Sequence, residues 1–255
     1  MRRRLGARFL RTAMVAGLCF AVGGNGMART ALDRCTEDAI LVFDGSGSMA
    51  EMGYNGLDLP RIMEAREALR ESLPEITPFR RVGLVVYGPG RDEPCLNVKL
   101  RLPPTPDAAG LIISEVDQLD PGGQTPLTRA VEDAAHALSF RDRPGTIVLI
   151  TDGKENCGGA TCQLAAQLAA DGLDLTVHVI GFKVRDRQFN WQSQKGVDQQ
   201  HGKTIARCLA DRTGGKYVST ESIGELVQAL QETLACPMVG QSAPPEPPVA
   251  IRSTV

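Results

Sequence analysis

Carboxylate and hydroxyl side chains gather in three short stretches that lie far apart in this 255-residue sequence. Asp44, Ser46 and Ser48 alternate with glycines in the first stretch, Thr125 lies in the second, and Asp152 lies in the third. Two carboxylates and three hydroxyls supply only oxygen ligands, which suit a hard cation such as Mg²⁺. Because the hydroxyls leave most of the charge of the cation uncompensated, an acidic ligand from outside can complete its coordination shell. The residue types therefore predict a divalent-cation site that also binds a carboxylate.

The spacing of the first stretch predicts how its side chains are presented. Ser46 and Ser48 are two residues apart, so both hydroxyls point the same way if the loop is extended. The intervening glycines allow such a loop to turn tightly around an ion. A simpler interpretation stays open, because Asp44 and Ser48 could cap the next helix and Asp152 could simply end a strand.

Buried apolar runs and helical periodicity predict the elements that must position these stretches. Buried strands are expected at 39–43, 82–87, 146–150 and 175–180, an edge strand at 98–102 and a short last strand at 216–219. Helical spacing occurs at 60–73, where Pro74 is expected to end the helix, and at 107–119, 127–138, 162–170, 204–211 and 222–234. This alternation predicts an α/β fold, a doubly wound Rossmann-like sheet that is mostly parallel, with one antiparallel edge strand and helices on both faces. Asp44 and Asp152 should then end neighbouring strands at the carboxyl edge, where such sheets bind ligands.

Together, the three stretches resemble the metal-ion-dependent adhesion site (MIDAS) of von Willebrand factor A (VWA) domains. The matching motifs, in the family's order, are Asp-Gly-Ser-Gly-Ser at 44–48, Gly-Gly-Gln-Thr-Pro-Leu at 122–127 and Thr-Asp-Gly-Lys-Glu at 151–155. The likeness covers roughly residues 39–234, and three motifs together are far more specific than any one alone. The strand at 82–88 and the loop from Glu155 to Cys162 look most like those of exported bacterial members.

The resemblance implies a set of metal ligands and a way of binding a partner. It implies Ser46, Ser48 and Thr125 as direct ligands, with Asp44 and Asp152 direct or bridged by water. It further implies Mg²⁺ as the ion, with Mn²⁺ or Ca²⁺ as alternatives, and a protein partner that presents an Asp or Glu to the ion. A domain of this kind is expected to act in adhesion or assembly and not to be an enzyme.

Two other interpretations compete with this one. Residues 45–50 also fit the dinucleotide fingerprint G-x-G-x-x-A, but Asp44 would repel a pyrophosphate, and no acidic residue ends the second strand to bind a ribose. A Mg²⁺-dependent phosphotransferase or phosphatase could use Asp44 as its nucleophile. However, Ser46 stands where such an enzyme needs a second acid, and no lysine is clearly placed to balance a phosphoryl group.

The N-terminus has the pattern of a secretory signal peptide. Arginines at 2, 3, 4, 8 and 11 precede an apolar stretch at 13–22, and small residues lead to a cleavage site expected after Ala28. The apolar stretch is too short to span a bilayer, so no transmembrane segment is expected in the mature chain. The alternative is an amphipathic helix of a cytosolic protein, which the lack of any acidic residue before Asp33 disfavours. We therefore expect an exported protein, periplasmic or secreted.

Composition narrows the class of protein and its partners. The chain has 28 basic and 30 acidic residues, and removing the five arginines of residues 1–28 leaves 23 basic residues and a formal charge of −7. A chain without a basic excess is not expected to bind nucleic acid. Contents of 42% hydrophobic and 23% charged residues are typical of a globular protein. We expect one VWA domain at 35–236 and a proline-rich, disordered tail at 237–255.

Six of the seven cysteines remain after residues 1–28 are removed, and an even number in an exported chain favours disulfides. The expected pairs are Cys35 with Cys236, Cys157 with Cys162, and Cys95 with Cys208. The first pair would tie the ends of the domain together. The last pair joins segments that should lie far apart, so a disulfide between Cys208 and either Cys157 or Cys162 stays open as the alternative.

A long polar segment at 182–203 holds Trp191, the only tryptophan of the chain. The segment should leave the same edge of the sheet as the metal loops, and an exposed tryptophan is a frequent interface anchor. Trp191 is therefore a predicted partner contact. The other interpretation, a solvated loop with one anchoring aromatic residue, stays open.

Overall fold

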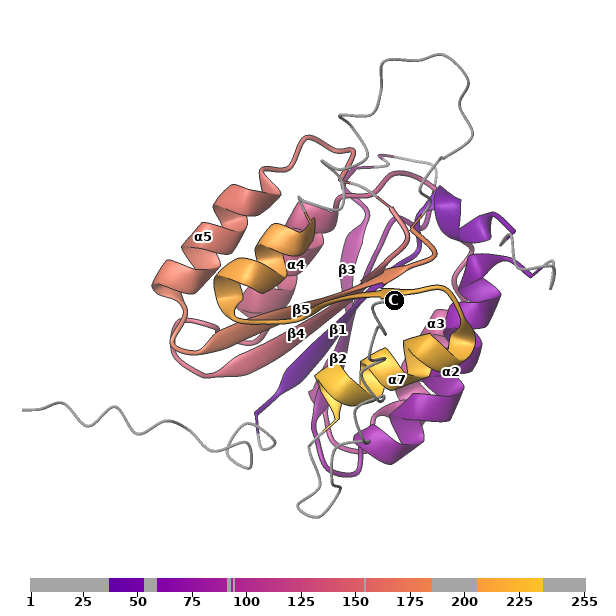
Figure 1. Cartoon of the computed structure of the whole chain (residues 1–255), viewed down its shortest axis with the longest axis horizontal. Helices are drawn as coiled ribbons and strands as arrows, with labels where there is room; N and C mark the ends of the chain where they lie inside the picture. The colour runs from indigo at the N-terminus through magenta and orange to yellow at the C-terminus, as the bar shows by residue number, and fades with distance from the viewer. Residues whose placement is uncertain are drawn as a thin grey trace, which may run out of the picture.

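A sheet of six strands organises the part of the chain that the structure describes (Figure 1). The structure is a computed structural model and describes residues 37–52, 59–90, 93, 95–153, 155–184 and 206–235. The strands are β1 (Ala39–Asp44), β2 (Val82–Tyr87), β3 (Val98–Thr105), β4 (Gly145–Thr151), β5 (Leu175–Phe182) and β6 (Tyr217–Thr220). Their order is β3-β2-β1-β4-β5-β6, and all pairs are parallel except β2 with β3. The predicted fold class is confirmed, with β3 as the antiparallel edge strand.

Helices cover both faces of the sheet (Figure 1). One face carries α2 (Arg61–Ile76), α3 (Ala109–Asp117) and α7 (Ile223–Leu234), and the other carries α4 (Leu127–Ala137), α5 (Thr161–Asp171) and a helix described at residues 206–213. In β1, Leu41 and Phe43 pack into the first of these two cores, whereas Ile40 and Val42 pack into the second. A central strand buried on both faces needs a continuous apolar run, which is why this segment was recognisable. No helix in the described ranges is long and apolar enough to cross a membrane.

The C-terminal end of α2 differs from the prediction. Pro74 lies inside the helix, which continues to Ile76, so the expectation that Pro74 ends it is wrong. The N–H of Thr77 donates to the carbonyl of Leu73 at 3.0 Å and closes the last turn beyond the proline. Pro74 is exposed. Its ring therefore faces solvent, and the helix lacks only the bond that the missing N–H would have made.

The register of the sheet brings the predicted site residues to one edge. β1 and β4 are direct neighbours, with Phe43 opposite Ile150. Asp44 therefore ends β1 beside the end of β4, and Asp152 follows β4 directly. The predicted adjacency of the two carboxylates is confirmed, and both lie at the carboxyl edge of the parallel strands.

Candidate metal centre

Asp44 is the last residue of β1 and lies fully buried at this edge of the sheet. Its Oδ1 accepts from the backbone N–H of Ser46 at 2.9 Å, and its Oδ2 accepts from the hydroxyl of Thr151 at 2.7 Å. One bond is local to the loop, and the other comes from the end of the neighbouring strand. The carboxylate is thus held in one orientation by both strands that end at the site.

The loop after β1 brings two hydroxyls together by a tighter path than an extended loop. Gly47–Ala50 form a 3₁₀ turn, η1, so the predicted extended conformation is wrong for Gly47 and Ser48, whereas Ser46 has extended angles (φ −68°, ψ 169°). Ser46 Oγ and Ser48 Oγ still lie 3.1 Å apart, and the Ser48 hydroxyl donates to Asp152 Oδ1 at 2.6 Å. The 3₁₀ turn allows Met49 to enter the core without separating the two serines.

Thr125 reaches the same place from the connection between α3 and α4. A Cβ atom placed on Gly153 would lie 3.6 Å from Ser48 Oγ and 3.7 Å from Thr125 Oγ1. The two hydroxyls therefore face one small volume next to Gly153, and Thr125 itself is 4% exposed. The three predicted stretches meet.

Glycines make this close approach of the loops possible. Gly88 and Gly123 have φ angles of +94° and +67°, which favour glycine, and a Cβ on either would lie 2.5 Å from backbone atoms of the facing loop. Backbone bonds then join the stretches, from Gly47 N to Gly123 O at 3.2 Å and from Gly122 N to Gly45 O at 2.9 Å. Hydrogen bonds thus join the loops after β1 and α3, and both loops pack closely against the loop after β2.

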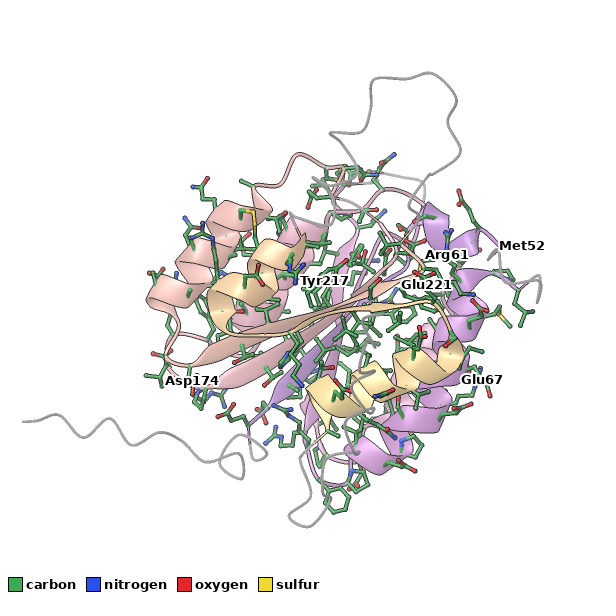
Figure 2. All side chains as sticks on the ribbon, in the orientation of Figure 1. Met52, Arg61, Glu67, Asp174, Tyr217 and Glu221 are labelled. Carbon is green, nitrogen blue, oxygen red and sulfur yellow. A yellow bond between two sulfur atoms is a disulfide. The ribbon has the colours of Figure 1, made fainter. Side chains whose placement is uncertain are left out.

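One charged residue of the site was not predicted. Arg61, in the first turn of α2 (Figure 2), donates through Nη1 to Asp152 Oδ2 and to the carbonyl of Ser48, both at 2.8 Å. The Arg61 and Asp152 side chains are 3% and 0% exposed. The only signal in the sequence is the charge itself, because a cation is disfavoured at a helix N-terminus unless an anion faces it.

The electrostatics of the site favour binding of a cation. Burial, and then the negative charge of Asp44, raises the pKa of Asp152 to about 6, against the opposing effects of the Ser48 hydrogen bond and of Arg61. Burial and the charge of Asp44 also raise the pKa of the Tyr87 hydroxyl well above its ordinary value. Two carboxylates held away from water thus lie close together, Arg61 pairs with Asp152, and a divalent cation would relieve the excess negative charge.

The donor set fits a hard cation. Within the described ranges, no group of three or more His, Cys, Asp or Glu side chains could hold a metal ion. The side chains that converge at this edge supply hydroxyl oxygens beside the two carboxylates, which is the ligand chemistry of Mg²⁺ and its relatives and not that of a soft metal.

Two disulfides lie close to this edge, and their pairing corrects the prediction. Cys95 pairs with Cys157, and Cys162 pairs with Cys208, at Cα–Cα distances of 5.5 and 5.2 Å. The expected pairs Cys157 with Cys162 and Cys95 with Cys208 are wrong, whereas the alternative that joined Cys208 to one of Cys157 and Cys162 is confirmed. Cys162 lies in the first turn of α5, on the sheet face that also carries the helix with Cys208, while Cys157 lies in the loop that faces Cys95. Cys35, Cys236 and Trp191 lie outside the described residues.

Comparison with known proteins agrees with the fold and the motifs. Residues 39–155 match the model of the von Willebrand factor type A domain. The matched residues contain all three motifs, and the sheet order and the helices on both faces agree with the resemblance to VWA domains.

Individual relatives are distant. The uncharacterized protein YwmD of Bacillus subtilis (strain 168) is 28% identical over 203 residues, which cover 75% of this chain and 82% of that protein. A von Willebrand factor type A structure from Catenulispora acidiphila has a TM-score of 0.55 at 18% identity, covering 78% of this chain and 42% of that one. The conserved hypothetical protein BatB from Bacteroides thetaiotaomicron has a TM-score of 0.53 at 19% identity, covering 77% of this chain and 98% of that one. At these identities the structural likeness concerns the fold alone.

Proposed function

We propose that the protein binds Mg²⁺ at this centre and uses the bound ion to hold a carboxylate of a partner protein. The observation that carries the proposal is the convergence of three loops on one point, where Ser48 bonds to Asp152 and the hydroxyl of Thr125 lies beside the same Gly153. The proposed ligands are Asp44, Ser46, Ser48, Thr125 and Asp152, directly or through water.

The carboxylates and the hydroxyls of the site would contribute differently to binding of the ion. Asp44 and Asp152 supply the negative charge that retains the ion, and Asp44 is already oriented by its two hydrogen bonds. The three hydroxyls bind without adding charge, so the ion stays attractive to an Asp or Glu of the partner. Because the mature chain would carry a formal charge of −7, this attraction must come from the ion itself. Mn²⁺ or Ca²⁺ could replace Mg²⁺ in the same oxygen set.

Export is part of the proposal. The two disulfides are of the kind that persist in oxidising compartments, and the N-terminal 28 residues have the order of a signal peptide. The working form would be a VWA domain at 35–236 followed by the tail at 237–255, acting in adhesion or assembly in a bacterial envelope. Trp191 would add contacts with the partner beside the ion.

Metal binding is tested by isothermal titration of the mature chain with MgCl₂. Wild-type protein should bind, whereas Asp44→Ala and Thr125→Ala should lose binding while keeping their circular-dichroism spectrum. Asp142→Ala is the matched control, because this exposed carboxylate lies before β4, at the opposite edge of the sheet. Equal binding by all four proteins would refute the assigned site.

Partner capture needs a second experiment. Envelope extract is passed over the immobilised domain in Mg²⁺, in EDTA, and over the Asp44→Ala variant. Proteins retained only by wild type in Mg²⁺ are the expected result, and retention that is indifferent to EDTA and to the variant would contradict a metal-mediated contact. Mg²⁺-dependent hydrolysis of a generic phosphoester that disappears in Asp44→Asn would instead establish an enzyme.

A further inference from the structure

The hydroxyl of Thr125 lies on a segment that belongs to neither a helix nor a strand. Thr125 sits in the connection after α3, one residue before the Pro126 that precedes α4. Pro126 provides no side-chain cap for this helix. The position of the Thr125 hydroxyl therefore depends on what holds this connection from outside.

Asn156 holds Thr125 from both sides of its backbone. The N–H of Thr125 donates to Asn156 Oδ1 at 2.7 Å, and the N–H of Asn156 donates to the carbonyl of Thr125 at 3.3 Å. The side chain and the main chain of Asn156 thus bond to the backbone N–H and the carbonyl of Thr125. Two such bonds restrict rotation of the threonine about its backbone more than one bond would.

The residues on either side of Asn156 hold the same region. Glu155 Oε2 accepts from the N–H of Thr128 at 2.7 Å, in the first turn of α4, and its Oε1 accepts from the N–H of Cys157 at 2.8 Å. A carboxylate is favourable at a helix N-terminus, so Glu155 caps α4 from a distant part of the chain. Cys157 is in turn bonded to Cys95 in the loop between β2 and β3.

We infer that residues 155–157, held by the Cys95–Cys157 disulfide, position Thr125 for the metal, and that Asn156 is the positioning residue that acts on it directly. The inference rests on the proposed function, since it assigns a role toward the bound ion. Groups that orient metal ligands typically change metal affinity by about 10- to 100-fold when they are lost. The Cys162–Cys208 disulfide ties α5 to the next helix and bonds to none of these three residues.

Magnesium titration of the mature chain tests the inference. Asn156→Ala should bind Mg²⁺ about 10-fold more weakly than wild type. Its thermal midpoint in EDTA should stay close to that of wild type. Asn156→Asp keeps an acceptor for the Thr125 N–H and should therefore recover the affinity. Unchanged affinity in Asn156→Ala, or equal loss in Asn156→Asp, would overturn the inference.

The disulfide is tested by matched double variants. Cys95→Ser/Cys157→Ser should weaken Mg²⁺ binding, whereas Cys162→Ser/Cys208→Ser should leave the affinity unchanged even if the protein becomes less stable. Equal affinity in both double variants would refute the role of the disulfide. If wild-type protein does not bind Mg²⁺, both the proposed function and this inference are refuted. If wild type binds and Asp44→Ala does not, but the Asn156 and Cys95/Cys157 variants bind like wild type, the inference alone is refuted.

Discussion

Arg61 compensates part of the negative charge of the site. Its guanidinium bonds to Asp152 and to the carbonyl of Ser48, and it is buried with the carboxylate it faces. Removing one partner of a buried ion pair typically costs more than the pair contributes, because the other charge is left uncompensated in a medium that solvates it poorly. Under the proposed function, Arg61 and the bound cation would therefore compensate the same carboxylate.

The Arg61→Ala variant tests whether Arg61 and a bound cation compensate the same carboxylate, Asp152. In EDTA, we expect the free energy of unfolding to fall by about 3–5 kcal/mol, and in saturating Mg²⁺ we expect a smaller loss because the ion compensates Asp152. Urea unfolding in both conditions measures the difference. Arg129→Ala, which breaks the exposed pair with Asp133, is the control and should cost less than about 1 kcal/mol in either condition. An equal loss for Arg61→Ala with and without Mg²⁺ would contradict the shared role.

α2 shows how an element can tolerate a residue that usually ends it. A proline costs a helix one backbone hydrogen bond and crowds the preceding turn. In α2 this happens within the last turn and on the solvent side, while Leu73 and Ile76 on the other side are fully buried against the sheet. Burial of this apolar face outweighs the local preference of Pro74.

Pro74→Ala should stabilise the protein. Alanine restores the N–H that the turn lacks and is the better helix former, while the freer unfolded chain takes back part of the gain. We expect the free energy of unfolding to rise by about 1 kcal/mol, measured as a higher urea midpoint at unchanged slope. A lower midpoint would mean that the proline ring makes contacts that stabilise the folded state.

At the scale of the whole molecule, the two disulfides among the described residues connect segments that the sheet alone leaves independent. Cys95–Cys157 joins the loop after β2 to the loop after β4, and Cys162–Cys208 joins two helices on one face. The sequence separations are 62 and 46 residues. Closing loops of this size removes entropy from the unfolded chain, worth about 4 kcal/mol each on the chain-entropy model.

Cys162→Ser/Cys208→Ser should therefore lower the free energy of unfolding by about 2–4 kcal/mol. Urea unfolding of the oxidised variant and wild type, followed by fluorescence, provides the comparison. Wild type in which Cys95–Cys157 and Cys162–Cys208 are reduced should be less stable than the variant, which keeps Cys95–Cys157. A variant as stable as wild type would show that strain or residual structure offsets the loop-closure term.

Local pattern was enough to predict the sheet and to recognise the three motifs. A strand buried on both faces must be apolar at every position, as Ala39–Phe43 is, and an edge strand tolerates alternating charge, as at Lys99 and Arg101. Ligands gather at the carboxyl edge of a parallel sheet, and from this rule the positions of Asp44 and Asp152 at neighbouring strand ends could be predicted without any knowledge of side-chain positions. These features depend on periodicity and on the order of elements, which the linear sequence contains.

Other features were decided only by the tertiary structure. Arg61 and Asp152 are 91 positions apart, and nothing in the local sequence of α2 indicates which anion its first turn meets. The cysteine partners and the contact of Asn156 with Thr125 likewise depend on how far each loop folds over the edge of the sheet. Periodicity determines which face a residue occupies, but the packing of distant loops determines which atoms meet, and for that reason the motifs could be predicted while the residues that orient them could not.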